Sequence, residues 1–308
     1  MTNLLSQLST LGIRPKKGLG QNFLVDPAHR AHIVAAAGLT PADVVLEVGP
    51  GPGVLTELIA AQAGRVIAVE LDDRLIPFLR DRFAAQPHVT IIHADILKLD
   101  VAALMSESVS QRVGESASER VGESANQRVG GERTTNYAIR TTQYKVIANL
   151  PYYITSAAIR HLLEAAPPPD LLVLTVQREV AERMVASPPE MSLLALGVQF
   201  YCTPRIVGRI PAGAFYPRPK VDSAVVRLDR RDDSPAGDVM AGAFFRAARA
   251  GFSQPRKQLR NSLAAGLGVA AGQAEQWLAA ANIVQQRRAE TLTLAEWGAL
   301  ARAVEGRS

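Results

Sequence analysis

The sequence has very little cysteine, with Cys202 the single example in 308 residues. One cysteine excludes an intramolecular disulfide and a zinc site built from several thiolates, and it fits a reducing compartment. The sequence also lacks an apolar run of the ~20 residues that a membrane-spanning helix requires. Residues 1–17 are polar and end in basic side chains, without the apolar centre of a secretory signal. We therefore expect a cytoplasmic protein that does not insert into a membrane.

An acidic excess is missing too, because 34 Lys and Arg stand against 29 Asp and Glu. The formal charge is +5 and the sequence pI is about 9.5. A basic balance fits a polyanionic partner only where the excess is clustered, so by itself it says little about function. The composition, 47% hydrophobic and 20% charged, is otherwise that of a globular protein with a packed core.

Short apolar runs alternate with helical segments along the chain. This alternation predicts an α/β fold, a Rossmann-like and mostly parallel doubly wound sheet with helices on both faces. The predicted strands are residues 43–48, 65–70, 89–95, 144–149, 171–176 and 223–228, and the predicted helices between the first of them are residues 27–37, 54–61 and 73–83.

Two composition changes divide the chain. The polar segment 230–237 ends the strand pattern, and helical spacing from Val239 onward predicts a small all-helical C-terminal domain. Its last helix is expected to begin with a capping box of Thr293 and Glu296. We therefore predict an α/β domain over 1–232 and a helical domain over 236–308, whose arginines suit binding to a polyanion such as RNA.

Residues 107–130 form a nearly perfect eight-residue repeat within an insertion, 101–143, between two predicted strands. Each repeat offers one Gly and one or two small apolar side chains besides its polar residues, which is too little apolar area to offset the entropy of ordering. We expect a disordered surface insertion. The alternative is an arm that recognises RNA, although its acidic and basic charges nearly cancel.

A glycine-rich loop, Gly49-Pro-Gly51-Pro-Gly53, follows the first predicted strand and opens a helix. Open α/β sheets bind ligands at this position, and glycine lets a ligand lie against the backbone. A dinucleotide site would need a third glycine where Val54 stands, so a nicotinamide or flavin site is not favoured. The pattern instead suits S-adenosylmethionine, and the alternative is a turn that only links strand and helix.

Acidic residues end the next two predicted strands. Glu70 is placed to accept hydrogen bonds from both ribose hydroxyls of a nucleoside, because a carboxylate presents two oxygens at one end. Asp95 can accept a hydrogen bond from the adenine amine of the cofactor. Each acid taken singly is as well explained by a helix cap or a solvated strand end.

The turn Asn149-Leu150-Pro151-Tyr152 follows a further strand and is the most specific feature of the sequence. The exocyclic amine of adenine is a poor nucleophile because its lone pair is conjugated with the ring. The Asn149 side-chain oxygen and the Leu150 carbonyl can accept its two N–H groups, Pro151 fixes the turn, and Tyr152 can stack on the base. The alternative is an Asn-Pro turn with core tyrosines.

The sequence resembles the small-subunit ribosomal RNA adenine dimethyltransferase family from Gly18 to its end, apart from the repeat. The motifs that carry the resemblance are residues 20–26, 47–51, 69–72, 94–95, 149–152 and 215–225. The resemblance implies a cofactor site made by Asn22, Leu24, Gly49, Glu70, Asp95 and Asn149, with Gly51 from the glycine loop. It also implies two successive methyl transfers to N6 of each of two adjacent adenines near the 3′ end of 16S rRNA. The implied partner is the rRNA of an assembling 30S-type particle, approached by a monomer.

Two departures from the family pattern concern substrate contacts. Tyr153 stands where relatives often have a small polar residue or Asn, and residues 189–194 replace a Tyr-Gly-x-Leu-Ser segment. His29 and His32 lie one helical turn apart, but they have no third ligand and no metal is expected. The candidate RNA contacts are Arg14, Lys16, Lys17, Arg246, Arg249, Arg256, Lys257 and Arg260. Each of them is equally explained as part of a solvated surface. Arg256 and Arg260 lie on one helix face if the helix is unbroken after Pro255.

Two other functions fit parts of the pattern. A related class of enzymes dimethylates an adenine of large-subunit RNA and confers macrolide resistance, but residues 215–225 and the basic helical tail favour the small-subunit interpretation. The second is a ribosome assembly factor or transcription factor that binds RNA or DNA but has lost catalysis. The presence of Glu70, Asp95 and Asn149 argues against this second function.

Overall fold

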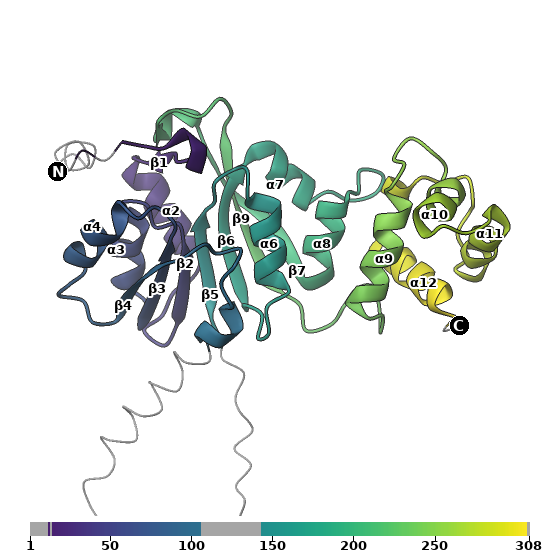
Figure 1. The fold of residues 1–308 in the computed structure, drawn as a ribbon, viewed down its shortest axis with the longest axis horizontal. Coiled ribbons are helices and arrows are strands. Elements are labelled where there is room, and N and C mark those ends of the chain that lie inside the picture. Colours follow the sequence, from purple (N-terminus) through teal and green to yellow (C-terminus); the bar gives the residue numbers. More distant parts are fainter. Residues whose placement is uncertain (1–11, 13, 106–142, 307–308) are drawn as a thin grey trace, which may run out of the picture.

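The computed structural model describes residues 12, 14–105 and 143–306 (Figure 1). The repeat at 107–130 lies outside the described residues, so its predicted disorder stays a prediction. The predicted start of the insertion at 101 is wrong, because residues 101–105 are helical and bury Val101 and Met105 in the core of the sheet. The described part consists of an α/β unit and, beside it, a group of helices at the C-terminal end of the chain. No helix among the described residues is both long enough and apolar enough to span a membrane.

A seven-stranded sheet forms the centre of the α/β unit. Its order is β4-β3-β2-β5-β6-β9-β7, so the chain starts in the middle, builds outward to one edge and then returns to build the other. The strands are β2 (Val44–Val48), β3 (Arg65–Glu70), β4 (Val89–His93), β5 (Lys145–Asn149), β6 (Leu171–Gln177), β7 (Cys202–Ile210) and β9 (Ser223–Arg230).

The pairs from β4 through to β6 are parallel, and β9 runs antiparallel to both of its neighbours, β6 and β7. The predicted class, a mostly parallel Rossmann-like sheet with a helical C-terminal segment, is confirmed. β9 can run antiparallel because it pairs with β7 through the short connection 211–222, which contains no long helix, whereas a parallel neighbour needs a long crossover.

Strand β7 was not predicted from the sequence. Pro204 and Gly208 interrupt its pattern, and proline in a run usually argues against a central strand. The structure places β7 at the edge of the sheet, where a missing N–H is tolerated, and the pairing with β9 shifts register between Ile206 and Gly208.

Helices cover both faces of the sheet (Figure 1). The apolar core beneath α2 (Pro27–Ala36) and α3 (Val54–Ala60) includes Ile33 and Ile59. The opposite core includes residues of α6 (Thr155–Leu163), α7 (Arg178–Met184) and α8 (Leu193–Tyr201). Helix α4 (Leu75–Arg82) buries Leu75 and Leu79 in a smaller cluster that also contains Phe23.

The C-terminal helices have their own apolar core around Trp297 and Phe244. Helix α8 contributes to it, because Phe200 packs on Phe244 with ring centroids 4.6 Å apart. The predicted capping box of Thr293 and Glu296 is confirmed. The domain boundary at 232–236 stays a prediction. The helices are α9 (Ala241–Gly251), α10 (Leu259–Leu267), α11 (Ala271–Ala280) and α12 (Leu294–Glu305), and short 3-10 turns lie at Lys17–Leu19, Ala212–Ala214 and Ala289–Thr291.

A second, two-stranded sheet joins two motifs that are far apart in the sequence. β1 (Phe23–Leu24) pairs antiparallel with β8 (Phe215–Tyr216), with Phe23 opposite Tyr216 and Leu24 opposite Phe215. The segment that precedes α2 is therefore held beside the segment that precedes β9.

Candidate active site

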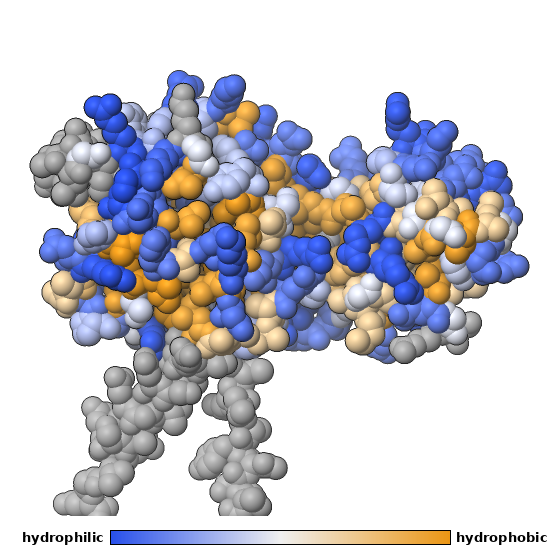
Figure 2. Space-filling model, viewed as in Figure 1, coloured by the Kyte–Doolittle hydropathy of each residue, from blue (hydrophilic) through white to orange (hydrophobic). Residues whose placement is uncertain are grey.

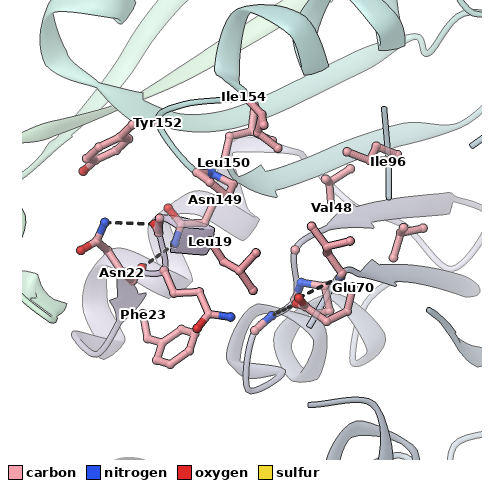
Figure 3. Close-up of a pocket in the computed structure, with 18 of the residues that line it drawn as sticks. Leu19, Asn22, Phe23, Val48, Glu70, Ile96, Asn149, Leu150, Tyr152 and Ile154 are labelled. Carbon is pink, nitrogen blue, oxygen red and sulfur yellow. Dashed lines mark hydrogen bonds between the residues drawn. The ribbon is translucent and has the colours of Figure 1, made fainter. Parts of the chain in front are cut away.

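A cavity of about 1170 Å³, partly open to solvent, lies where the ends of β2, β3 and β5 meet (Figure 3). All the predicted cofactor-binding and catalytic residues line it: Asn22, Leu24, Gly49, Gly51, Glu70, Asp95, Asn149, Leu150, Pro151 and Tyr152.

The sheet explains why these residues meet. Val48 of β2 pairs with Val69 of β3 on one side and with Ala148 of β5 on the other, all in parallel register. The residues that follow each strand are then brought to the same edge. The glycine loop, Glu70 and Asn149 are therefore neighbours although they are dispersed along the chain.

The glycine loop is bonded to the end of β3. The Gly51 N–H donates to Glu70 Oε2 at 3.0 Å, and Gly51 has φ of +57°, a region that glycine adopts without strain. A Cβ on Gly51 would meet the Phe23 ring at 3.2 Å, so the loop lies close against the N-terminal segment. A Cβ on Gly49 would meet no atom within 4 Å, which leaves its side of the cavity open to a ligand.

Glu70 is 6% exposed, and its carboxylate is already well provided with donors. Oε1 accepts the N–H groups of Leu71 and Asp72, both at 2.9 Å, in addition to the Gly51 bond on Oε2. Burial raises the pKa of Glu70, while these N–H groups oppose the rise. A carboxylate has about four acceptor positions, so one position on Oε2 remains for a hydroxyl of a bound nucleoside.

Asp95 lies at the other side of the cavity, two residues beyond the end of β4. Its Oδ1 accepts the Leu97 N–H at 3.0 Å, and Lys98 Nζ lies 3.9 Å from Oδ2. The side chain is 29% exposed. The nearest cation to Oδ2 is therefore too distant for a hydrogen bond, and Oδ2 retains the capacity to accept one.

Asn149 ends β5 and is oriented by the N-terminal segment. Its Nδ2 donates to the backbone carbonyl of Asn22 at 3.1 Å. A carbonyl can only accept, so the atom that faces Asn22 is the amide nitrogen and the free end of the side chain is Oδ1. Asn22 in turn donates from its own Nδ2 to the Gly20 carbonyl at 3.2 Å. The side-chain oxygen that the sequence analysis singled out is thus the free acceptor.

The rest of the turn is anchored on both sides. The Leu150 side chain is buried in the sheet core, and its N–H donates to the Thr175 carbonyl at 3.2 Å. The Pro151 carbonyl accepts from the Thr155 hydroxyl at 3.2 Å. The hydroxyl of Tyr152 lies 3.0 Å from Ser223 Oγ, and burial raises the pKa of Tyr152. The tyrosine ring is therefore held at the cavity wall as a neutral, oriented side chain.

The N-terminal segment forms one wall of the cavity from Leu19 to Leu24 (Figure 3). Leu24 is 2% exposed, packs in the core under α2, and its carbonyl accepts from Arg30 Nε at 2.9 Å. Tyr153 also lines the cavity, but it is 60% exposed. A Cβ on Gly20 would lie 3.1 Å from the Tyr153 ring, so the ring packs on this segment.

Two buried polar features near the cavity were missed by sequence reasoning. Glu47 is 1% exposed, and both of its carboxylate oxygens lack a hydrogen-bond partner among the described residues. Burial raises the pKa of Glu47 to about 8. The other feature is the bonding of Gln21 to Asp72, described below. Glu47 and Gln21 both belong to motifs that carry the family resemblance, but nothing in the sequence around them indicates which residues they contact.

The candidate RNA contacts are only partly free. Arg246 and Arg249 are exposed on α9, as are Arg256 and Lys257 in the loop before α10. The predicted shared helix face of Arg256 and Arg260 is wrong, because α10 begins only at Leu259. The residues after Pro255 form a turn, and Arg260 pairs with Glu275 at 2.8 Å.

The histidine pair has other partners than a metal. His29 Nδ1 lies 3.0 Å from Asp26 Oδ1, and His32 Nε2 lies 2.9 Å from the Val207 carbonyl. In the described part of the chain, no group of three or more His, Cys, Asp or Glu side chains is arranged to hold a metal ion.

The donor and acceptor set of the cavity fits S-adenosylmethionine. A buried carboxylate with a remaining acceptor position suits a ribose, and the open backbone at Gly49 suits a ligand that lies against the glycine loop. The apolar side chains of Leu19, Val48 and Ile96 line the same cavity and suit the faces of an adenine ring.

Comparisons with known proteins show which family the chain resembles. The family model described as "Ribosomal RNA adenine dimethylase" matches residues 12–300. A ribosomal RNA small subunit methyltransferase A of Dehalococcoides mccartyi is 44% identical over 285 residues, which cover 92% of this chain and 87% of that protein. The protein of the same name from Alkaliphilus oremlandii is 38% identical over 92% of this chain and 90% of its own length.

Two solved structures share the fold. A dimethyladenosine transferase from Plasmodium falciparum has a TM-score of 0.64 at 23% identity and covers 89% of this chain and 94% of its own. The 23S rRNA methyltransferase ErmE has a TM-score of 0.62 at 24% identity. The match covers 92% of this chain and 100% of the ErmE chain. The sequence matches confirm the predicted enzyme class, with S-adenosylmethionine as methyl donor, and the chain belongs to the ribosomal RNA adenine dimethylase family.

Proposed function

We propose that this protein transfers methyl groups to N6 of two adjacent adenines near the 3′ end of small-subunit rRNA, within an assembling 30S-type particle. The proposal includes action as a monomer in the cytoplasm. It rests on the Asn149 side chain, whose nitrogen is engaged by Asn22 and whose oxygen is free to accept. The curated relatives named small subunit methyltransferase A support the choice of subunit.

The Asn149 oxygen and the Leu150 carbonyl are proposed to accept the two N–H groups of the adenine amine. These acceptors favour a pyramidal amine, whose lone pair is less conjugated with the ring and can attack a methyl group. Because such interactions strengthen as the amine becomes positively charged, they lower the barrier more than they strengthen ground-state binding. The methylated amine is acidic enough to lose its extra proton to water, so the chain needs no strong base beside the amine and contributes mainly positioning.

Tyr152 and Pro151 are proposed to hold the base. The Tyr152 ring is restrained at its hydroxyl by Ser223, so it offers a fixed face for stacking at little cost in side-chain entropy. Pro151 limits the conformations of the turn, which keeps the Leu150 carbonyl in one direction. S-Adenosylmethionine, when bound, supplies an electrophilic methyl group on its sulfonium.

The remaining cavity residues are proposed to bind the cofactor. Glu70 accepts from the ribose, Asp95 from the adenine amine of the cofactor, and the loop of Gly49 and Gly51 contacts its amino acid end. Asn22 and Leu24 complete the wall. The exposed arginines of α9 are proposed to contact phosphates, since they lie outside the cavity and form no ion pair with an acid among the described residues.

Mass spectrometry of rRNA tests this function. Purified protein is incubated with S-adenosylmethionine and either immature small subunits or naked large-subunit RNA. Dimethyladenosine at two adjacent positions in the small-subunit RNA is the expected result. Modification of large-subunit RNA alone would support the macrolide-resistance class, and no S-adenosylmethionine binding in calorimetry would support a binding-only factor.

A further inference from the structure

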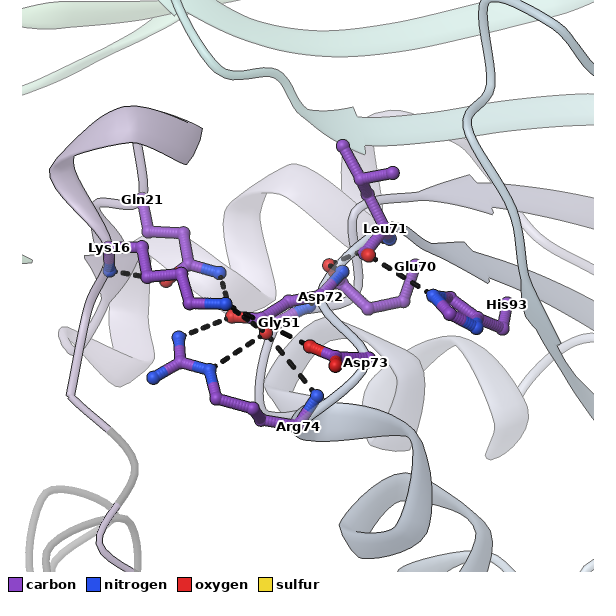
Figure 4. A network of polar contacts seen from close by, with 9 residues as sticks. All are labelled: Lys16, Gln21, Gly51, Glu70, Leu71, Asp72, Asp73, Arg74 and His93. Carbon is purple, nitrogen blue, oxygen red and sulfur yellow. Dashed lines mark hydrogen bonds and ion pairs between the residues drawn. The ribbon is translucent and has the colours of Figure 1, made fainter.

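A buried carboxylate lies at the centre of a polar network beside the cavity (Figure 4). Asp72 follows Glu70 by two residues, and its side chain is 0% exposed. Arg74 donates to it from Nε at 2.9 Å and from Nη2 at 2.6 Å, and Lys16 Nζ lies 3.5 Å away. A buried charge is costly unless donors surround it, so loss of any one of these donors is expected to leave the carboxylate less well compensated.

Gln21 connects this carboxylate to the N-terminal segment. Its Nε2 donates to Asp72 Oδ2 at 2.8 Å, and its Oε1 accepts the Lys16 N–H at 2.8 Å. Both ends of the amide are therefore used, as Figure 4 shows. The bond fastens the segment that forms the cavity wall to the loop that follows β3.

The next residue fastens the same segment to the catalytic turn. The carbonyl of Asn22 receives the hydrogen bond from Asn149 Nδ2. The N–H of Asp72 meanwhile donates to Glu70 Oε1. Two consecutive residues, Gln21 and Asn22, thus link the proposed cofactor carboxylate on one side to the proposed acceptor of the adenine amine on the other.

Asp72 keeps its charge throughout the working pH range. Burial alone would raise the pKa of Asp72, but hydrogen bonds from Arg74 and Gln21 outweigh it and hold this pKa far below its usual range. Gln21 is only partly buried and contributes one amide. The bond between them is therefore a charge-assisted hydrogen bond between a fully buried carboxylate and a partly buried amide.

We propose that Gln21 and Asp72 form a latch that holds residues 16–24 as a wall over the cofactor and thereby orients Asn149. They are positioning residues, because neither is placed at the reacting atoms. The latch couples the two halves of the site, so that closing it favours both cofactor binding and the productive direction of the Asn149 oxygen. This inference rests on the proposed function.

Gln21→Met tests the latch by keeping the length of the side chain and removing both hydrogen bonds. Loss of a hydrogen bond to a charged group corresponds to about a tenfold rise in the Kd for S-adenosylmethionine, measured by calorimetry. The turnover number is expected to fall as well, because Asn149 loses its orientation. Amide hydrogen exchange of residues 16–24 should accelerate in the cofactor-free protein, while exchange in the sheet strands stays unchanged.

Gln21→Glu gives a readout that a merely structural role would not produce. It places a second carboxylate within hydrogen-bond distance of Asp72, and two adjacent carboxylates cannot both remain ionised without repulsion. At pH 8.5 the latch should open and the Kd should rise at least tenfold. At pH 5.5 a shared proton should close it again and bring the Kd back toward that of the wild type.

Gln62→Glu is the matched control, since Gln62 is exposed beyond the end of α3 and the net charge changes equally. The Kd of Gln62→Glu for S-adenosylmethionine should equal that of the wild type at both pH values. Wild-type affinity and wild-type exchange in Gln21→Met would overturn the latch, and so would a loss in Gln21→Glu that is the same at pH 5.5 and 8.5. The exchange measurement needs no transferase activity, so a wild-type protein that fails to methylate RNA would refute the proposed function and leave the latch to be judged separately.

Discussion

The side-chain amide of Asn149 donates to the backbone carbonyl of Asn22 across 3.1 Å, although 127 positions separate the two residues. This bond decides which end of the Asn149 side chain is available to a substrate. A side chain that flipped would present an N–H group where an acceptor is needed. The N-terminal segment therefore orients the proposed acceptor of the adenine amine, in addition to forming a wall of the cavity.

Asn149→Ala is expected to abolish methyl transfer and leave the Kd for S-adenosylmethionine within about tenfold, because the acceptor acts mainly in the transition state. Single-turnover kinetics and calorimetry measure the two effects separately. Asn261→Ala, at an exposed position on α10, serves as control. Unchanged turnover in Asn149→Ala would rule out the assigned role.

Glu70→Ala is expected to weaken S-adenosylmethionine binding by about 1 to 3 kcal/mol, since a buried acceptor of hydrogen bonds is lost. The three backbone N–H groups that it accepts also lose their partner, so the loop after β3 should loosen. Calorimetry gives the affinity, and circular dichroism checks the fold. Normal affinity in a folded variant would contradict the ribose assignment.

Glu47→Gln is expected to remove a pH dependence of stability. The pKa of Glu47 is about 8 in the folded protein against 4.5 for a free side chain, so the folded state binds the proton more tightly. The stabilisation is full below about pH 4.5 and is lost as the pH rises through 8. The variant should match the wild type at pH 4.5 and exceed it by a few kcal/mol at pH 9.

Urea unfolding at the two pH values measures this difference. Glu190→Gln, at an exposed position, should change stability little at either pH. A Glu47→Gln variant that is equally destabilised at pH 4.5 and pH 9 would show that the carboxylate is ionised and paired in the folded protein.

Tyr153→Ala is expected to weaken RNA binding by about 1 to 3 kcal/mol if the exposed ring stacks on a base beside the target adenine. The ring is 60% exposed at the cavity mouth and rests on Gly20. Filter binding of small-subunit RNA measures the loss, and Tyr153→Phe should retain affinity because it keeps the aromatic face. Equal affinity for all three proteins would show that this departure from the family pattern has no substrate role.

Gly298→Ala is expected to destabilise the C-terminal helices by about 3 kcal/mol. A Cβ at Gly298 would lie 1.9 Å from the Ala236 carbonyl oxygen, so α12 would have to move. Gly272→Ala on α11 is the control, because its Cβ would meet no atom within 4 Å and should stabilise the helix by about 0.5 to 1 kcal/mol. Thermal unfolding compares the two variants, and equal melting temperatures would contradict the close packing.

The sequence by itself determined the positions of most strands and the chemistry at their ends. Apolar runs that bury both faces identify a parallel strand locally, and Glu70 and Asn149 were found because they directly follow such runs. The edge strand β7 was not predicted, because Pro204 and Gly208 interrupt its run of apolar residues. A strand at the edge of a sheet is only partly buried, so it does not need a continuous apolar run.

Only the tertiary structure decided which groups contact one another across the chain. The bonds of Gln21 to Asp72 and of Asn22 to Asn149, and the pairing of β1 with β8, join segments whose separation in sequence leaves no periodic trace. The same is true of Arg260, which looked free and is paired with Glu275. Local patterns record burial and turn chemistry, whereas these contacts depend on how the sheet and its loops are packed in space.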